Sequence, residues 1–329
     1  MAPRGRNTGK GTGAKKSGGG RAAAAKSGRA PAAKKGRPST AKASRSAARP
    51  AARTGRAPAR GVRGGAGDAR GPRKPVEKGL GGEQVEGRQA VRELLIAQRR
   101  KVREIWFAND IDSAPIIEDI EQLAHASRIT IQEVARKRLE ERARSEAPQG
   151  VIAFAAPVPE ASFADMLRGT SNTPPFLVAV DGVTDPGNLG ALLRCCDGAG
   201  VTGVVLPRHR AVHVTPTVAK ASAGAVEHVP MALVSGLPTA ISQMREKGIW
   251  VVGLDDKSTR NLWEIGDLAR EGICVVLGAE GAGLSRLVRE RCDEVVSIPM
   301  RGQVSSLNVS AAAALATYEV ARARLAGRS

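Results

Sequence analysis

Residues 176–194 read FLVAVDGVTDPGNLGALLR, an apolar run followed by a turn and the beginning of a helix. The run Phe176–Val180 contains no polar residue, which is typical of a strand buried on both faces of a sheet. The turn holds two aspartates, three glycines and one proline. Such a turn leaves backbone N–H groups free beside the positive end of the following helix. Asn188 and Arg194 project from this turn and helix, although an ordinary capped turn with a surface arginine is the alternative.

The surrounding sequence alternates between apolar strands and helices, which predicts an α/β fold with a mainly parallel sheet covered by helices on both faces. Ligands of such sheets bind in the turns that follow the carboxyl ends of the strands. We expect further strands at 201–206, 249–254, 273–277 and 294–299, and helices at 188–200, 238–247, 285–291 and 307–325.

A smaller α/β domain is expected before this sheet. Strand patterns at 103–108, 129–134 and 150–155 alternate with helical patterns at 87–100 and 135–145, and with a helix for which Ser113 is the expected cap. A stretch rich in Pro, Ser and Thr follows. We therefore expect a tail at 1–80, a small domain at 81–156, a linker at 157–174 and a second domain at 175–329.

The basic excess of the chain lies in its first 80 residues. The whole chain has a formal charge of +19, whereas residues 1–80 hold 22 Lys or Arg against only Asp68 and Glu77, a balance of +20. The tail has no aromatic residue and almost no branched aliphatic ones, so it buries too little apolar surface to offset its ordering entropy, and we expect disorder. Its expected partner is a polyanion bound through charge; the alternative is a merely solubilising extension.

The rest of the composition indicates a cytoplasmic protein. The chain begins Met-Ala-Pro-Arg without the apolar core of a signal peptide, and no apolar run reaches membrane-spanning length. Its four cysteines have no metal-type spacing and its four histidines are scattered, so we expect no metal site and a reduced compartment. The cysteines are Cys195, Cys196, Cys274 and Cys292.

Two further loops follow expected strands. The second loop, LGAEGAG (277–283), has Glu280 at its middle, and its glycine spacing differs from that of a dinucleotide fingerprint. The third loop, IPMRGQVSSLN (298–308), is rich in hydroxyl and amide groups just before the last helix. Taken alone, these loops are also explained by a glycine turn and by Ser305 or Ser306 as a helix cap.

Together the three loops resemble the SpoU (TrmH-like, SPOUT superfamily) family of RNA ribose 2′-O-methyltransferases. The pattern D-G-V-T-D-P-G-N-L-G-A-x-x-R precedes L-G-A-E-G-x-G and then I-P-M-x-G-x-V-x-S-L-N-V-S, in the family's order over about 130 residues. Residues 81–156 resemble the family's small substrate-binding domain, which is of the ribosomal-protein L30e type. The layout is most similar to the RlmB-type branch, which methylates a guanosine of large-subunit ribosomal RNA.

The resemblance implies a C-terminal trefoil knot, a homodimer with active sites near its interface, and S-adenosyl-L-methionine as the methyl donor, with no metal. It places the donor-contacting positions at Gly278, Ile298 and Leu307, with Met300 as a neighbour. It places the polar catalytic positions at Asn188, Arg194, Glu280, Ser306 and Asn308.

Each polar position has an expected role. Arg194 has been viewed in the family as the base, but we favour a charged clamp on a phosphate and on the developing alkoxide, because a guanidinium stays protonated. Asn188 and Asn308 suit fixing the ribose and the loops, and Glu280 suits orienting Arg194 or loop amides. Ser306 either bonds the ribose hydroxyl or caps the last helix.

Some alternatives stay open. Pro148 stands where relatives often have a histidine before Gln149-Gly150; if that histidine binds RNA in the relatives, this chain lacks the contact. Transfer RNA is the alternative substrate, and a catalytically silent RNA-binding or ribosome-assembly factor is the alternative outside the enzyme class. A DNA-compacting protein, suggested by the tail alone, would leave the three loops without a purpose.

Overall fold

The computed structural model describes residues 79–169, 173–209 and 212–327, and these belong to one compact unit. The expected disordered tail lies outside the described residues, apart from its last two. Among the described helices, none is both long and apolar enough to cross a bilayer.

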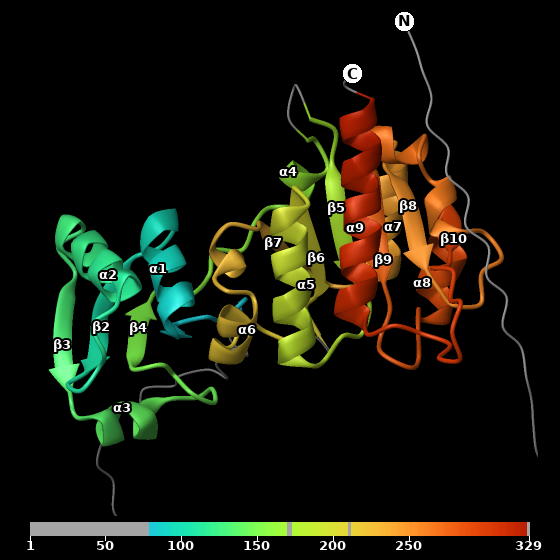
Figure 1. The fold of residues 1–329 in the computed structure, drawn as a ribbon. Helices are drawn as coiled ribbons and strands as arrows, with labels where there is room; N and C mark the ends of the chain where they lie inside the picture. The colour runs from blue at the N-terminus through green and yellow to red at the C-terminus, as the bar shows by residue number, and fades with distance from the viewer. Residues whose placement is uncertain (1–78, 170–172, 210–211, 328–329) are drawn as a thin grey trace, which may run out of the picture. The chain divides into compact units, whose positions relative to one another are not determined.

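The first part of the described chain builds a four-stranded mixed sheet with the strand order β1-β4-β2-β3 (Figure 1). Strand β4 pairs antiparallel with both β1 and β2, whereas β2 and β3 run parallel. The elements are β1 Gln84–Glu86, α1 Arg88–Ala97, β2 Val102–Ala108, α2 Pro115–Ala126, β3 Thr130–Val134, α3 Arg136–Arg142 and β4 Val151–Ala155.

Two sequence predictions for this sheet were wrong. Strand β1 was missed, because it has only three residues and two of them, Gln84 and Glu86, are polar yet buried. The Glu86 carboxylate accepts hydrogen bonds from the backbone N–H groups of Arg144 and Ser145, which compensates for its burial. Helix α2 follows Ala114 and has no side-chain cap, so Ser113 is not the cap.

The second part of the described chain builds a six-stranded sheet in which every pairing is parallel. This agrees with the mainly parallel sheet that the sequence predicted. Its strand order is β10-β8-β9-β5-β6-β7. The strands are β5 Phe176–Val180, β6 Gly203–Pro207, β7 Met231–Val234, β8 Trp250–Leu254, β9 Ile273–Leu277 and β10 Glu294–Val296. The helices are α4 Phe163–Met166, α5 Pro186–Gly198, α6 Pro216–Ala221, α7 Leu237–Glu246, α8 Arg286–Arg291 and α9 Val309–Ala326, with single 3-10 turns at Ala225–Glu227, Leu262–Glu264 and Leu268–Arg270.

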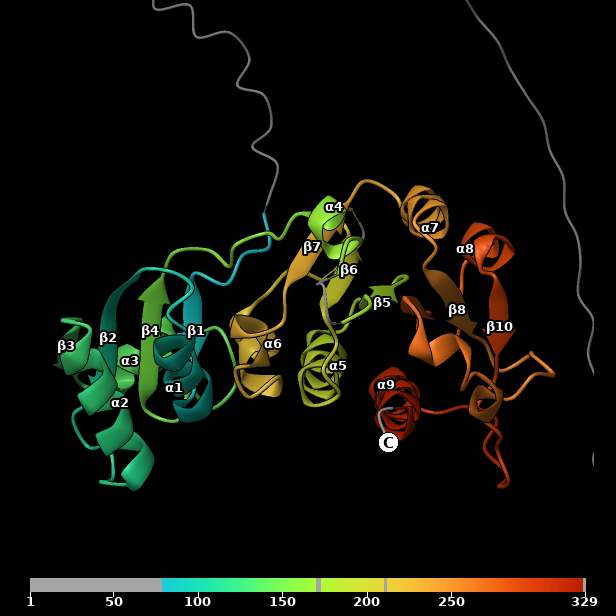
Figure 2. The same cartoon turned by 90° about the horizontal axis from the view of Figure 1, so that it is seen from above.

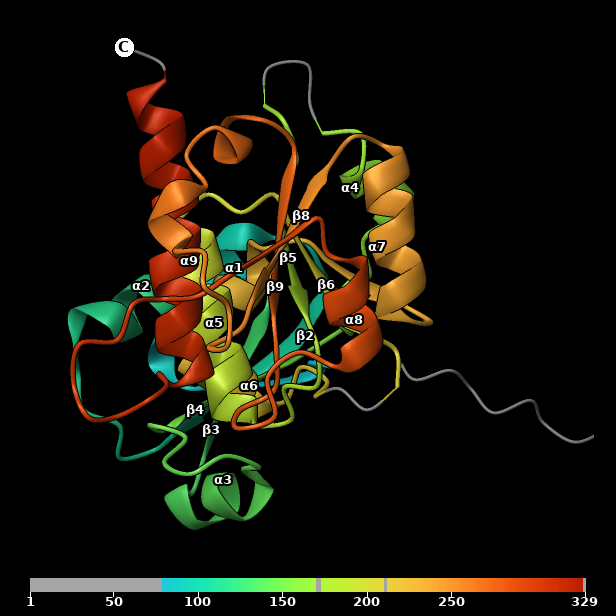
Figure 3. The same ribbon diagram turned by 90° about the vertical axis from the view of Figure 1, so that its right-hand side faces the viewer.

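Helices cover both faces of this sheet. Helices α5 and α9 lie side by side on one face, and α7 and α8 lie on the other (Figures 2 and 3). The chain runs outward from β5 to β6 and β7, then crosses to β8 and returns to β9 beside β5. The order of strands therefore reverses between β5 and β9, and a parallel sheet opens a crevice for ligands at such a switch point.

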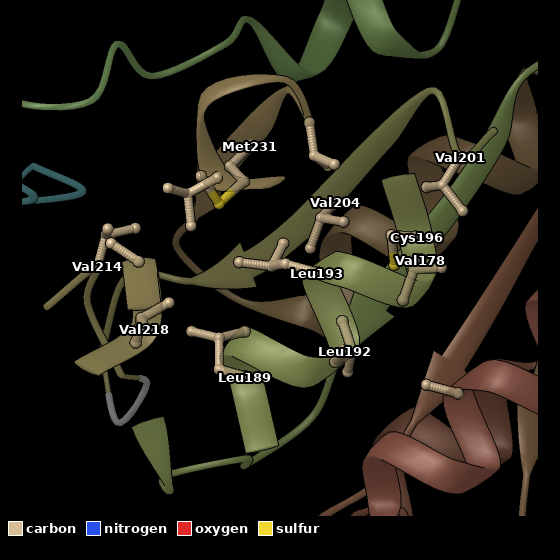
Figure 4. Packing of buried hydrophobic residues seen from close by; sticks show 14 of the residues in the cluster. Val178, Leu189, Leu192, Leu193, Cys196, Val201, Val204, Val214, Val218 and Met231 are labelled. Atoms are coloured by element: carbon tan, nitrogen blue, oxygen red, sulfur yellow. The ribbon is translucent and has the colours of Figure 1, made fainter. Parts of the chain in front are cut away.

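The core beneath α5 explains why the quoted stretch forms a helix on this sheet. Leu189, Leu192, Leu193 and Cys196 follow helical spacing and are almost fully buried. They lie over Val178 of β5 and over apolar residues of β6, α6 and β7 (Figure 4). Burial of such side chains contributes about 1.5–3 kcal/mol each, so this face of α5 holds the first loop rigidly at the sheet edge.

The expected boundaries shift at several elements. Helix α1 ends at Ala97 rather than 100, α3 is shorter than 135–145, and α5 begins at Pro186 rather than 188. Strand β10 ends at Val296 and α9 begins at Val309. Three elements of the second part of the chain were not predicted. They are α6, β7 and the short helix α4, which lies inside the expected linker.

A buried ion pair ties the small sheet to the segment before β7. Arg100, between α1 and β2, donates to the Glu227 carboxylate at 2.5 and 2.9 Å, and both side chains are almost inaccessible to solvent. The same guanidinium also donates to the carbonyl oxygens of Gly82 and Ala156, at the two ends of the small sheet's chain segment. Arg100 thus holds three separate chain segments together.

Candidate active site

The first loop is shaped by the start of α5. Asp185 caps the helix, since its carboxylate accepts a hydrogen bond from the backbone N–H of Asn188 at 2.7 Å, and Pro186 occupies the first helical turn. Gly190 faces α6 so closely that a Cβ there would lie 2.7 Å from the carbonyl oxygen of Val218. The glycine therefore lets α5 and α6 pack against each other, which fixes the direction of the residues around it.

Three polar side chains from the three loops meet in one hydrogen-bonded chain. Nδ2 of Asn188 donates to Oε2 of Glu280 at 3.2 Å, and Nδ2 of Asn308 donates to Oδ1 of Asn188 at 2.9 Å. The loops lie 92 and 120 residues apart in sequence at these contacts. The convergence expected from the sequence is thus present for Asn188, Glu280 and Asn308. Within this chain the partner of Glu280 is Asn188 and not Arg194.

The second loop folds back on itself after β9. The backbone groups of Ala279 and Gly283 exchange two hydrogen bonds of 2.9 and 3.0 Å. A Cβ on Gly278 would overlap the backbone of Gly283 and Leu284, so only glycine allows this close return. The backbone N–H of Asp181 in the first loop donates to the carbonyl of Leu277 at 2.7 Å, which locks the first two loops together.

The third loop has a different character. Among the described residues, the backbone groups of 298–307 make no hydrogen bond to other backbone groups. Asn308 caps α9, since its Oδ1 accepts from the N–H of Ser310 at 2.8 Å, so the alternative of a cap at Ser305 or Ser306 is excluded. Ser306 is exposed and is left free for another role.

A cavity opens at the carboxyl ends of β8 and β9, and we call it the strand-end cavity. It brings together the four residues that the resemblance assigns to the methyl donor, together with Glu280 and Ser306. Residues of the second and third loops line it, together with the segment 254–257 and the start of α9. Its lining comprises Leu254, Asp255, Asp256, Lys257, Leu277, Gly278, Ala279, Glu280, Gly281, Ala282, Gly283, Ile298, Met300, Ser305, Ser306, Leu307, Val309 and Ala312.

The segment Leu254–Lys257 was missed by the sequence analysis. It follows β8, which neighbours β9 in the sheet, so its turn comes to the same edge. The available signal was the expected strand at 249–254, because the carboxyl ends of parallel strands share an edge. No glycine pattern marks this turn, so the sequence alone does not single it out.

Asp255 is a fixed negative charge in this wall. Burial raises the pKa of its carboxyl, but the backbone N–H of Lys257 and the guanidinium of Arg289 lower it by more, so the pKa lies below its ordinary value. The carboxylate accepts from the Lys257 N–H at 2.9 Å and pairs with Arg289. Asp255 is therefore ionised at neutral pH and paired with Arg289, and it shares the cavity lining with Lys257.

Arg194 is the one expected catalytic residue that does not join the others. It is exposed and lines a second cavity with residues of α1 and of the segment after α6. Arg194 follows Asn188 by six positions on α5, which corresponds to about 9 Å along the helix axis and about 240° around it. The two side chains of one chain therefore leave the helix in different directions.

The cysteines take no part in either cavity. Burial raises the pKa of the Cys196 and Cys274 thiols, and burial together with the neighbouring Asp293 raises the pKa of Cys292 to about 12. All four cysteines are free. These thiols are accordingly protonated at neutral pH and are poor nucleophiles.

Two family models and several relatives match this chain. Residues 175–318 match the model of the SpoU rRNA methylase family, and residues 84–161 match the RNA 2′-O ribose methyltransferase substrate-binding model. The chain is 38% identical to the 23S rRNA (guanosine-2′-O-)-methyltransferase RlmB of Pasteurella multocida (strain Pm70), over 74% of this chain and 99% of that protein. It is 40% identical to the RlmB of Vibrio cholerae, over 65% and 85%.

Solved structures show the same likeness. The SpoU methyltransferase AviRb from Streptomyces viridochromogenes, in complex with the cofactor AdoMet, aligns with a TM-score of 0.62 and 27% identity, over 74% of this chain and 90% of that chain. An RNA 2′-O ribose methyltransferase aligns with a TM-score of 0.60 and 27% identity. With family models matched over residues 84–161 and 175–318 and with an RlmB relative covered along nearly its whole length, this chain belongs to the SpoU family of RNA methyltransferases.

Proposed function

We propose that this protein transfers a methyl group from S-adenosylmethionine to the ribose 2′-hydroxyl of a guanosine in large-subunit ribosomal RNA. The observation that carries the proposal is the hydrogen-bonded chain of Glu280, Asn188 and Asn308, of which Glu280 lines the strand-end cavity. The RlmB relatives, which are named for guanosine 2′-O-methylation of 23S rRNA, support the choice of substrate.

The strand-end cavity suits S-adenosylmethionine. The third loop offers backbone donors and acceptors that no other described backbone group uses, which suits the polar edge of a purine. Ile298, Met300 and Leu307 supply apolar contacts, and the Gly278 turn brings backbone close to the cavity. When bound, the donor supplies a methyl group on a positively charged sulfur, and the acidic residues Asp255 and Glu280 complement that charge.

The polar chain holds the acceptor. Glu280 accepts from Asn188, and Asn188 accepts from Asn308, so the amide groups are fixed in orientation. Amide groups both donate and accept, which suits holding a ribose hydroxyl in line with the reacting carbon. Positioning of this kind can lower a barrier by roughly 7–11 kcal/mol. Ser306, which is not the helix cap, is assigned to the ribose hydroxyl.

Arg194 acts as a charged clamp in this proposal. A guanidinium stays protonated at neutral pH and presents a planar set of donors, so it suits the phosphate beside the target ribose and the negative charge that develops on the 2′-oxygen. The proton then leaves late, to water or to a phosphate oxygen.

Arg194 also supports a homodimer. Because it lies away from the strand-end cavity of its own chain, the proposed dimer brings the Arg194 of one copy to the cavity of the other. The exposed apolar residues Leu315, Tyr318 and Leu325 on α9, with exposed fractions of 40%, 54% and 69%, supply a face suited to a second copy. These three residues recur at near-helical spacing, so they form one stripe.

The remaining parts of the proposal follow the family. We assign residues 81–156 to an L30e-like RNA-binding domain, 157–174 to a linker and 175–329 to catalysis, in the cytoplasm and without a metal. The trefoil knot of the family is part of the proposal. The return of the third loop from the edge strand β10 to Asn188 supports it.

The deciding experiment is mass-spectrometric mapping of 2′-O-methylation on ribosomal and transfer RNA from a strain that lacks the gene, followed by methylation of the same RNA in vitro. We expect one guanosine of large-subunit ribosomal RNA to lose its methyl group and to regain it with the purified protein. Modification of transfer RNA instead would move the substrate to that class. Calorimetry that detects no S-adenosylmethionine binding would favour the catalytically silent RNA-binding factor.

A further inference from the structure

The second cavity, which we call the helix cavity, has no assigned role. Helix α1 supplies Gln89 and Glu93, helix α5 supplies Arg194 and Asp197, and the segment after α6 supplies the remaining wall. Its volume is about 470 Å³, within the usual range of small-molecule sites. The complete lining is Gln89, Glu93, Arg194, Asp197, Ser222, Ala223, Ala225 and His228.

One of the two carboxylates in this cavity is already committed. Glu93 accepts from Nε2 of Gln89 at 2.9 Å and from Nη1 of Arg92 at 3.1 Å, and it lies 2.9 Å from Nε2 of His228. With three partners around two oxygens, Glu93 has little capacity left for a ligand. Its visible role is to join α1 to His228 across the cavity.

The other carboxylate is free. Among the described residues, neither Asp197 nor Arg194 makes a side-chain hydrogen bond or an ion pair, although they lie three residues apart on the same face of α5. One helical turn thus presents an unused acceptor and an unused donor to the same cavity. Ala223 opposite them has a φ of 51°, a left-handed conformation that costs a residue with a side chain of order 1 kcal/mol or more.

Resting on the function proposed above, we infer that the helix cavity holds the base of the target nucleotide and that Asp197 reads it as guanine. Arg194 remains on the phosphate and the reacting oxygen. The base of the same nucleotide then lies beside the next turn of α5, where Asp197 stands. Asp197 is a specificity-determining residue in this arrangement.

The chemistry of a free carboxylate selects guanine among the four bases. Guanine alone presents two adjacent donors, N1–H and the N2 amino group, on its Watson–Crick edge, and a carboxylate accepts both at once. Adenine and cytosine present one amino donor beside a ring acceptor, which a carboxylate would repel. Enzymes that act on a nucleotide commonly read its exposed base through this edge.

The test changes Asp197 in the protein and the N2 amino group of guanine in the RNA, one at a time and together. The probe is the RNA fragment that carries the mapped target, synthesised with guanosine or with inosine, which lacks the N2 amino group. For the unsubstituted protein we expect kcat/KM to fall about tenfold on inosine, the usual effect of losing one hydrogen bond to a charged group. For Asp197→Asn we expect about tenfold lower kcat/KM on guanosine, and for Asp197→Ala, which loses both hydrogen bonds, about a hundredfold. Neither variant should show a further loss on inosine.

The controls separate this contact from general damage. Asp267→Asn removes an exposed carboxylate outside both cavities and should keep the tenfold preference for guanosine. Thermal unfolding of every variant checks that Asp197→Asn keeps its fold. A variant Asp197→Asn that retains the full guanosine preference overturns the inference, and so does a loss of the preference in Glu93→Gln instead.

The two proposals fail in different ways. A mapped target other than guanosine, or methylation of the inosine fragment at an unchanged rate, overturns the reading of the base but leaves ribose methylation standing. The absence of methylation on any RNA overturns both.

Discussion

Asn308 donates a hydrogen bond of 2.9 Å from its Nδ2 to Oδ1 of Asn188, and with its own Oδ1 it caps helix α9 through the N–H of Ser310. One side chain therefore sets both the start of the last helix and the orientation of an amide in the first loop. The two functions use different atoms, so a substitution can separate them.

The substitution Asn308→Asp should keep the cap and lose the donor. An aspartate cap accepts from the Ser310 N–H as well as asparagine does, so the unfolding free energy should stay within about 0.5 kcal/mol. Methylation should fall by at least tenfold, because Asn188 loses its donor and a charge comes near Glu280. Asn308→Ala should lose activity and about 1 kcal/mol of stability. Denaturant unfolding and single-turnover methylation measure the two effects, and full activity in Asn308→Asp would contradict the proposed role.

Arg194→Ala and Arg194→Lys should both lower the turnover by roughly 10²–10³-fold, the usual effect of removing a donor to developing negative charge. Lysine keeps the charge but not the planar set of donors. S-adenosylmethionine affinity, measured by calorimetry, should stay unchanged, since the proposed partners of Arg194 are the phosphate and the 2′-oxygen of the RNA and not the donor. The matched control Arg286→Lys, on exposed α8, should be neutral in both measurements. Near-normal turnover in Arg194→Lys would exclude the planar clamp.

Gly278→Ala should damage the strand-end cavity selectively. The added methyl group would overlap the backbone of Gly283, so the second loop must open, at a cost of about 1–3 kcal/mol. We expect S-adenosylmethionine affinity to fall by tenfold or more in calorimetry. Gly266→Ala, where no atom lies within 4 Å of the new methyl group, should bind the donor normally. Equal affinity in the two variants would mean that the loop tolerates opening.

Arg100→Met and Glu227→Leu should each destabilise the protein by about 3–5 kcal/mol, because each leaves a buried charge without its partner. The double variant should be more stable than the sum of the two losses predicts, since it removes both charges together. Urea unfolding of the four proteins measures this coupling. Strictly additive losses would show that the pair is not coupled.

Asp255→Asn should lower stability at neutral pH and much less in acid. The pKa of Asp255 is depressed in the folded protein, so its stabilising effect is complete above the unfolded value of about 3.9 and disappears as the pH falls through the folded value. Unfolding measured at pH 7 and at pH 3 should therefore show a difference between the two proteins that shrinks toward acid. A difference that is constant over this range would contradict the assignment.

The sequence was most informative where one physical rule dominated. Strands β5 and β9 were predicted with their exact bounds, because a continuous apolar run of five residues is typical of a strand buried on both faces. The convergence of Asn188, Glu280 and Asn308 followed from the shared edge of parallel strands. Strands β1 and β7 were missed, since three or four residues carry too little periodicity for a prediction.

The position of Arg194 shows a different limit. A sequence motif groups residues that are close together along the chain. A helix turns by about 100° per residue, so two residues of one motif can line different cavities. The periodicity of α5 already separated Asn188 from Arg194. The periodicity of α5 could not predict the opposite wall of the helix cavity, because Glu93 and His228 come from segments far away in sequence.

The backbone of the third loop, which makes no hydrogen bond to other described backbone groups, should become ordered when a ligand binds. A segment without internal hydrogen bonds gains its partners from whatever occupies the cavity, so its amide protons should exchange with deuterium quickly in the free protein and slowly once a ligand is seated. Part of the affinity is then consumed in ordering the segment, which keeps binding from becoming too tight. Under the proposed function, this ordering cost would favour release of the spent donor after each turnover.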